Sequence, residues 1–207
     1  MSEHHIASRE QLRAVYKQPT EGAVKKLLQQ LDQHCMDFIA RCPFVVLSTS
    51  GADGSLDASP KGGEPGFLTV QDASTVLLPD WPGNNRLDSL ENILDNPHVG
   101  MMLLVPGMDE NLRINGRAGL STDPDLLASL AVKGKSPISV VVVTVEEAYL
   151  HCARAVWRAD LWNAEKHIKR SDFPTMGQML ADQVPGYDGA AADKVIADTR
   201  HKLYALD

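Results

Sequence analysis

Apolar positions in the first 42 residues recur every three or four residues, the spacing that places them on one face of a helix. Ser8 and Gln11 have the form of a capping box and predict a short helix over residues 9–17. A second helix is predicted from Thr20 until Pro43 stops it. Its expected buried face consists of Val24, Leu27, Leu28, Leu31, Cys35, Phe38 and Ile39.

After Pro43 the pattern changes to short β-rich runs separated by turn residues. Three hairpins supply six strands, at residues 44–50 with 55–59, 67–70 with 75–78, and 99–105 with 112–120. Residues 138–150 are the longest strand candidate. Short helices are predicted at 122–131 and at 86–94, the latter with an inward face of Leu87, Leu90, Ile93 and Leu94. Six short antiparallel strands with two small helices predict a closed or partly closed barrel, not alternating βαβ units.

The sequence contains no internal repeat and no clear domain boundary, so residues 1–207 are expected to form a single domain. N-terminal helices are expected in residues 1–42 and the barrel core in residues 43–163. A polar, helical extension is expected in residues 164–207, which proline and glycine interrupt. The predicted fold class is therefore mainly β with helical ends.

Composition narrows the class of protein. The chain is 43% hydrophobic and 23% charged with a net charge of −7, which argues against intrinsic disorder and against a nucleic-acid partner. No signal-peptide core is present, and no apolar run approaches the roughly 20 residues of a membrane span. We therefore expect a soluble, cytoplasmic protein without a membrane partner. Cys35, Cys42 and Cys152 form no CxxC pair and are interpreted as free, buried thiols.

The common catalytic motifs are absent from the sequence, which has no GxGxxG, Walker A loop, GxSxG or HExxH. Its seven histidines are dispersed, and no metal site is expected. His151 and Cys152 are adjacent, so on a strand they point to opposite faces and make a poor nucleophile pair. Three polar segments are better candidates for a functional site.

The first segment is residues 57–63, where Lys61 precedes Gly62 and Gly63 at the exit of a strand. A lysine beside exposed backbone N–H groups suits the binding of a phosphate. The alternative interpretation is a solvated lysine in a turn.

The second segment is residues 78–90, in which a strand ends, a Pro-Gly turn follows, and Asn84, Asn85 and Arg86 open a helix. Helix N-termini stabilise anions. Asn85 is expected to cap the helix, Ser89 to lie in its first turn, and Arg86 to contact phosphate oxygens in a bidentate manner. The alternative is a capped helix with an arginine that faces solvent.

The third segment is residues 111–118, where polar and apolar side chains alternate along a strand. Asn111, Arg113, Asn115 and Arg117 share one face. That face is either solvated, or it lines a polar cofactor groove where the barrel meets a partner subunit.

In this order, and on short antiparallel strands, the three segments resemble the pyridoxamine 5′-phosphate oxidase-like, FMN-binding split-barrel family. Within it, the chain is most similar to a bacterial subgroup of oxidase-related flavin-nucleotide-binding proteins. The likeness covers roughly residues 35–163 and is strongest in LPDWPGNNRLDSLENILDNPHVGMMLLVPG, LRINGRA and HCARAVWRADLW. It implies a six-stranded antiparallel split barrel and a homodimer, with one FMN in each of two clefts at the subunit interface.

The resemblance also implies which residues contact FMN. The strand that borders the isoalloxazine and whose lysine approaches the phosphate matches Ser59, Pro60, Lys61 and Gly62. The strand end beside the ribityl chain and the phosphate-binding turn after it match Pro79, Asp80, Asn84, Asn85, Arg86 and Ser89. Contacts from the other subunit match Asn111 and Arg113, and the C-terminal approach to the flavin matches Arg154, Arg158 and Trp162.

The chain departs from the vitamin B6 oxidase itself. That enzyme has an arginine-led strand before its phosphate lysine, whereas LDASP precedes Lys61 here. Its terminal basic and aromatic segment, which recognises the substrate phosphate, has no clear counterpart in DKVIADTRHKLYALD. The departures concern the substrate and leave flavin binding as the expectation.

Three functions follow as hypotheses. The leading one is an FMN-dependent oxidoreductase that transfers hydride to or from a small organic or nicotinamide substrate, since a flavin carries the redox chemistry itself. The second is a flavin-nucleotide-binding protein without turnover, serving as a store or sensor. The third is a haem-handling split barrel, which requires an axial ligand such as His98 or His151.

Overall fold

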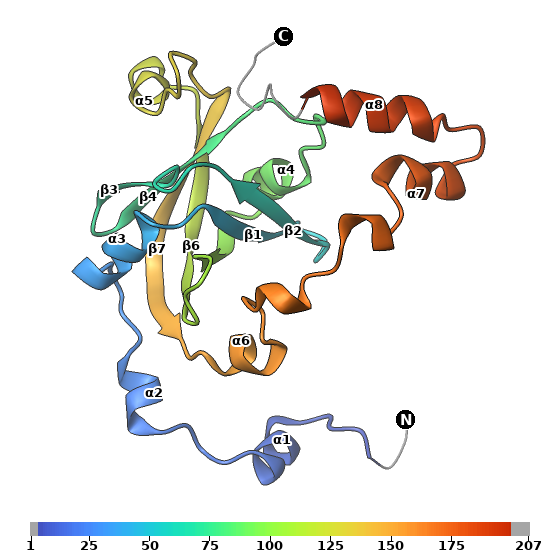
Figure 1. The fold of residues 1–207 in the computed structure, drawn as a ribbon. Helices are drawn as coiled ribbons and strands as arrows, with labels where there is room; N and C mark the ends of the chain where they lie inside the picture. The colour runs from blue at the N-terminus through green and yellow to red at the C-terminus, as the bar shows by residue number, and fades with distance from the viewer. Residues whose placement is uncertain (1–3, 200–207) are drawn as a thin grey trace.

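The computed structural model describes residues 4–199, and its centre is one antiparallel sheet that curls into a split barrel (Figure 1). The strands are β1 (Phe44–Ser50), β2 (Leu56–Gly62), β3 (Thr69–Asp72), β4 (Thr75–Asp80), β5 (His98–Leu104), β6 (Asn111–Ser121) and β7 (Ser139–His151). Their order across the sheet is β2-β1-β5-β6-β7-β4-β3. The split-barrel fold is confirmed, but the sheet has seven strands and not six. The six strands of the predicted hairpins are joined by β7, the strand candidate at residues 138–150, which pairs with both β6 and β4.

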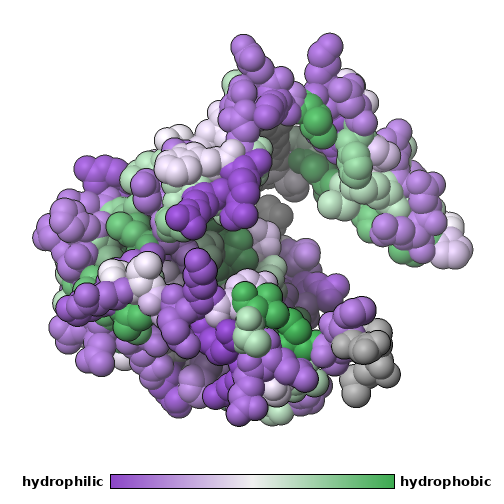
Figure 2. Space-filling view, turned by 90° about the horizontal axis from the view of Figure 1, so that it is seen from below, coloured by the Kyte–Doolittle hydropathy of each residue, from purple (hydrophilic) through white to green (hydrophobic). Residues whose placement is uncertain are grey.

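Helices flank the sheet and form both ends of the described chain. They are α1 (Arg9–Val15), α2 (Glu21–Lys25), α3 (Gln33–Ile39), α4 (Asp88–Asp95), α5 (Pro124–Ser129), α6 (Arg154–Ala159), η1 (Ala164–Lys166), η2 (Arg170–Asp172), α7 (Met176–Gln183) and α8 (Gly189–Thr199). Helix α4 packs on β1, β2 and β6, whereas α1 with α2, and α7 with α8, project away from the barrel (Figure 1). Figure 2 shows a lobe on the right, the side of α7 and α8 in Figure 1, that a wide gap separates from the rest of the molecule. Within residues 4–199, no helix is long and apolar enough to cross a membrane.

Alternation along the strands builds the core. On β6, Leu112 and Ile114 are fully buried, while the polar residues between them lie on the outer face of the sheet. Strand β4 is covered on both faces instead. Val76 and Leu78 join the barrel core, and Leu77 packs in a second small cluster under α5. This double burial explains why β4 has a continuous apolar run.

The prediction of one long helix between Thr20 and Pro43 is wrong. Helix α2 ends at Lys25 and α3 begins at Gln33, and between them Leu28 exchanges two backbone hydrogen bonds of 2.9 Å with Ala148 of β7. Val24 and Leu27, expected on a buried face, are 58% and 43% exposed. Pairing with the sheet has replaced helical hydrogen bonds here, which is a tertiary effect that helical periodicity does not contain.

Three smaller expectations also fail. Helix α4 begins at Asp88, two residues later than predicted, and Leu87 and Leu94 are 44% and 74% exposed, not inward. Cys35 and Cys42 are free and buried as predicted, but Cys152 is exposed. Burial raises the pKa of the Cys35 thiol to about 11, so this thiol stays protonated at neutral pH.

Candidate functional site

A cavity of about 340 Å³ lies between β2, the end of β4 and the start of α4. Ser59 and Lys61 reach it because they alternate with Pro60 and share the inner face of the sheet with their cross-strand partners on β1. The cavity brings together predicted flavin contacts from the first two segments, namely Ser59, Lys61, Asp80, Asn84, Asn85, Arg86 and Ser89. We call it the inner cavity.

Lys61 is not the solvated turn residue of the alternative interpretation. It is the last residue but one of β2, at the exit of that strand as predicted, and its Nζ is 2.7 Å from Oδ1 of Asp80. The two side chains are 23% and 14% exposed, so the pair is largely shielded from solvent. An anion that enters the inner cavity therefore has to share Lys61 with the carboxylate of Asp80.

Arg86 is the second cation that borders the inner cavity. Its Nε donates to Oδ2 of Asp88 at 2.5 Å, and this contact raises the pKa of Arg86 above its ordinary value. The side chain is 77% exposed, and its terminal amino groups make no hydrogen bond to any residue between 4 and 199. Arg86 thus keeps donors available for an incoming oxyanion.

The start of α4 lacks a side-chain cap. Asn84 accepts a hydrogen bond from the backbone N–H of Arg86 at 3.0 Å, and Asn85 has a left-handed φ of 57°. The N-cap position belongs to Leu87, so the prediction that Asn85 caps the helix is wrong. Ser89 lies in the first turn as predicted, is buried, and donates its hydroxyl to Asp57. An uncapped helix start that borders a cavity favours an anion.

Asn111 and Arg113 lie on the other face of the sheet, because they alternate with the buried residues of β6. The Arg113 guanidinium is 3.2 Å from the Glu147 carboxylate and 4.3 Å from the centre of the Tyr149 ring. Lys26 approaches the same ring at 4.8 Å. The structure therefore does not bring these residues to the inner cavity. We refer to Lys26, Asn111, Arg113, Tyr149 and His151 as the outer cluster.

Three polar atoms of the outer cluster are buried without a hydrogen-bond partner among residues 4–199. They are Oδ1 of Asn111, Nε of Arg113 and Nε2 of His151. Each such atom lowers the stability of the fold by about 1–3 kcal/mol while it stays unpaired. The three atoms therefore mark a surface that lacks hydrogen-bond partners within this chain's described residues. The sequence interpretation considered His151 only as part of a poor nucleophile pair and as a possible axial ligand of haem. Its position directly across from Asn111 on the paired strand is the signal that was missed.

The burial and charges of the outer cluster lead to a prediction about the titration of His151. Burial, together with the charges of Arg113 and Lys26, lowers the pKa of His151 below 6.5, so the ring is neutral at pH 7. Because the folded-state pKa lies below the unfolded one, this histidine destabilises the fold as pH falls below 6.5. Arg113→Gln is expected to move the His151 midpoint upward in an NMR titration. Arg117→Gln, on the same strand but in contact with His98, is the control and is expected to leave the midpoint unchanged.

The remaining predicted contacts lie elsewhere. Pro60 and Gly62 are exposed on β2, and Pro79 lines a separate cavity of about 270 Å³. Arg154 and Arg158 are exposed on α6. The Nε1 of Trp162 donates to the carbonyl of Met108 at 2.8 Å. None of these six residues lines the inner cavity, and their flavin contacts remain predictions.

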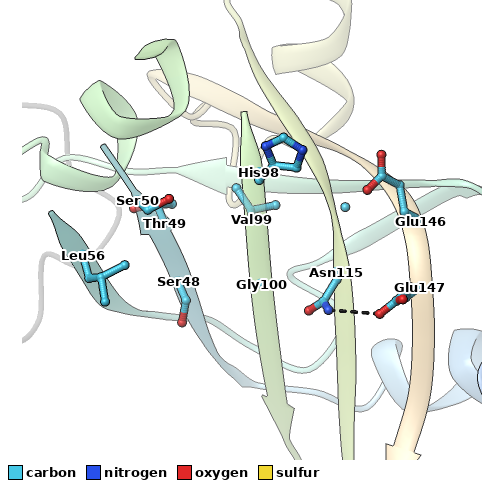
Figure 3. A pocket seen from close by; sticks show the side chains of 11 residues that line it. Ser48, Thr49, Ser50, Leu56, His98, Val99, Gly100, Asn115, Glu146 and Glu147 are labelled. Atoms are coloured by element: carbon cyan, nitrogen blue, oxygen red, sulfur yellow. Dashed lines mark hydrogen bonds between the residues drawn. The ribbon is translucent and has the colours of Figure 1, made fainter. Parts of the chain in front are cut away.

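A further hollow of about 610 Å³ lies on the outer face of the sheet (Figure 3). Its floor is formed by Ser48, Gly100 and Asn115, which are cross-strand neighbours on β1, β5 and β6. The pairing of β6 with β7 shifts register next to Asn115, which leaves Glu146 as an extra residue before Glu147. Both carboxylates therefore border this outer hollow, which the sequence interpretation missed.

The chain is similar to one family model and to several solved structures. The family model described as pyridoxamine 5′-phosphate oxidase matches residues 31–152. Similar solved structures include a putative pyridoxamine 5′-phosphate oxidase from Lactobacillus delbrueckii, with 23% identity over 59% of this chain and 95% of that chain and a TM-score of 0.45. HupZ from Group A Streptococcus is 18% identical over 58% of this chain and 93% of that chain, with a TM-score of 0.48. The comparison with curated proteins finds no match.

The family match spans more than half of the chain and contains every part of the inner cavity. It also contains all seven strands and the unpartnered atoms of the outer cluster. The resemblance seen in the polar segments is thus confirmed over the whole barrel, and the chain belongs to the pyridoxamine 5′-phosphate oxidase family.

Proposed function

We propose that this protein binds FMN and acts as an FMN-dependent oxidoreductase on a small organic or nicotinamide substrate. The observation that carries the proposal is the inner cavity, in which Lys61, Arg86 and the uncapped start of α4 meet. A phosphate group fits this set of donors, because charge-assisted hydrogen bonds and a helix N-terminus both favour it. Family membership supports a flavin as the group that carries the phosphate.

The chain's own residues bind and orient in this proposal. When bound, the isoalloxazine supplies the redox chemistry. Lys61 and Arg86 hold the phosphate, and the Ser59 hydroxyl borders the same cavity. No protein nucleophile is needed for hydride transfer, so a site without a catalytic triad is compatible with this reaction.

A homodimer is part of the proposal because the predicted contacts face in opposite directions. Lys61 faces the inner side of the sheet, whereas Asn111 and Arg113 lie on its outer side. One chain cannot present both sets to the same small ligand without bending the sheet. A second copy can supply the outer cluster, whose unpartnered Asn111, Arg113 and His151 atoms offer hydrogen bonds to the polar edge of a flavin.

The test is the visible spectrum of the purified protein, followed by mass spectrometry of the released cofactor. A flavin spectrum and the mass of FMN support the proposal, and a colourless protein that does not take up added FMN contradicts it. Steady-state oxidation of NAD(P)H with an added acceptor then tests turnover. A bound flavin that only dithionite reduces indicates a store or sensor.

Asp80→Asn is expected to tighten FMN binding about fivefold. The amide removes a negative charge 2.7 Å from Lys61 and leaves the ammonium free for the phosphate, a gain of about 1 kcal/mol for a largely shielded pair. Titration with FMN, followed by flavin fluorescence, measures the change. Glu91→Gln on the exposed side of α4 removes the same charge nearby and is the control. Weaker binding in Asp80→Asn would instead show that Asp80 is needed to position Lys61.

A further inference from the structure

Residues 4–27 form an N-terminal arm that extends away from the barrel (Figure 1). Its helices α1 and α2 bury no residue, and Leu12, Val15 and Tyr16 of the arm are 41%, 67% and 60% exposed. Helices of five to seven residues are not stable in water by themselves. Yet α1 is specified locally, since the Ser8 hydroxyl accepts from the Gln11 N–H at 3.2 Å. The arm therefore has the form of a segment that packs against a surface.

Apolar and basic side chains meet at the end of α1. Leu12 and Arg13 belong to the helix, Tyr16 is its extended C-cap and Lys17 follows, and these four residues line a shallow hollow of about 430 Å³ with Pro19. Two cations thus accompany two apolar residues. A complementary surface needs an exposed apolar residue and carboxylates.

The outer hollow of the barrel offers these groups at its two edges. Leu56 on β2 lines one edge and is 83% exposed, whereas β7 forms the other edge, with β1, β5 and β6 between them. Glu146 and Glu147 border the same hollow (Figure 3), and Glu146 makes no hydrogen bond or ion pair to any residue in the described range 4–199. Figure 3 shows these side chains around a floor of small residues on neighbouring strands.

The arm and the barrel carry opposite net charges, which agrees with this pairing of basic with acidic side chains. Residues 4–27 contain five basic and two acidic side chains. Residues 31–152, which the family model matches, contain seven basic and sixteen acidic side chains. An arm of net positive charge and a barrel of strongly negative charge attract one another, and this attraction weakens with salt.

We propose that α1 of one chain, with Tyr16 and Lys17 after it, docks across the outer hollow of a second copy, with Leu12 and Tyr16 toward Leu56 on β2, and with Arg13 and Lys17 toward the two glutamates on β7. In the structure the arm leaves the barrel at the Leu28–Ala148 pairing and points away from it. Reciprocal exchange of the two arms forms a closed, two-fold symmetric contact. The docking goes beyond the proposed homodimer by naming its surfaces, and it does not depend on flavin binding.

Cross-linking of isotope-mixed protein tests the docking. Labelled (¹⁵N) and unlabelled chains are refolded together in equal amounts and treated with a zero-length carbodiimide, which joins lysines to carboxylates. We expect peptides that link Lys17 to Glu146 or Glu147, with about half of them pairing a labelled and an unlabelled chain. Links within one isotope only, or no link at this position, overturn the proposal. The flavin absorbance of the same samples tests FMN binding separately.

A charge exchange supplies the second test, read by hydrogen exchange of residues 9–16. Lys17→Glu is expected to reduce amide protection in α1 by at least threefold, and adding Glu146→Lys is expected to restore it. Lys25→Glu on α2 is the matched control and is expected to leave α1 unchanged. Protection of the barrel amides in each variant reports whether it has folded. Unchanged protection in Lys17→Glu, or no rescue by the exchange, contradicts the docking.

Discussion

Replacing Gly116 by alanine is expected to lower the free energy of unfolding by about 3 kcal/mol or more. A Cβ at this position lies 2.0 Å from the carbonyl oxygen of Thr144 and 3.3 Å from the Cα of Val145. Gly116 stands where the pairing of β6 with β7 shifts register, in the middle of two long strands. Neither backbone can move away without breaking hydrogen bonds of the barrel. Urea denaturation followed by circular dichroism measures the loss.

Gly119→Ala is the matched control for this prediction. Gly119 lies three residues further along β6, and a Cβ there meets nothing within 4 Å. We expect its free energy of unfolding to stay within about 0.5 kcal/mol of the original protein. A similar loss in both variants would show that the close approach of Gly116 to Thr144 is not the cause.

Arg86→Ala is expected to weaken FMN binding at least tenfold. Arg86 borders the inner cavity, and its terminal amino groups have no partner among residues 4–199. A charge-assisted hydrogen bond to phosphate contributes about 1.5–3 kcal/mol, and about 1.4 kcal/mol corresponds to a factor of ten. Because the side chain is 77% exposed, the substitution is not expected to affect folding. A fluorescence-quenching titration with FMN gives the dissociation constant.

Arg117→Ala is the control for Arg86→Ala. Arg117 is exposed on β6 and contacts His98, and it does not line the inner cavity. The two variants lose the same charge from the same acidic protein, so only a local contact separates them. Equal affinities for FMN in both would exclude Arg86 as the phosphate ligand.

The strands of the barrel are predicted by local sequence patterns. The alternation of apolar and polar residues over 112–120 predicts β6, and the turn residues after Ser50 predict the β1–β2 hairpin, and both elements are present. Most of the helices at both ends are likewise specified by their caps, as Thr175 with Gln178 in α7 shows. Such features depend on contacts between residues close in sequence.

The candidate site depended more on contacts between distant residues. The polar segments were found by residue type, and the inner cavity does join the first two. The pairing of Lys61 with Asp80, nineteen positions apart, was not predicted. The position of His151 beside Asn111 was not predicted either, because the two residues become neighbours only when β6 pairs with β7. Residue type identifies candidate ligands, but it does not show which other side chains they meet.

The sequence by itself determined the antiparallel strands, the hairpins and the polar segments of this protein, because periodicity and turn chemistry act over a few residues. Only the tertiary structure decided that residues 26–32 leave the helix, with Leu28 pairing with Ala148 of β7, and that β7 lies between β6 and β4. It also placed Lys61 and Arg113 on opposite faces of one sheet. These outcomes depend on which strand lies beside which, and long-range pairing of that kind leaves no periodic signal along the chain.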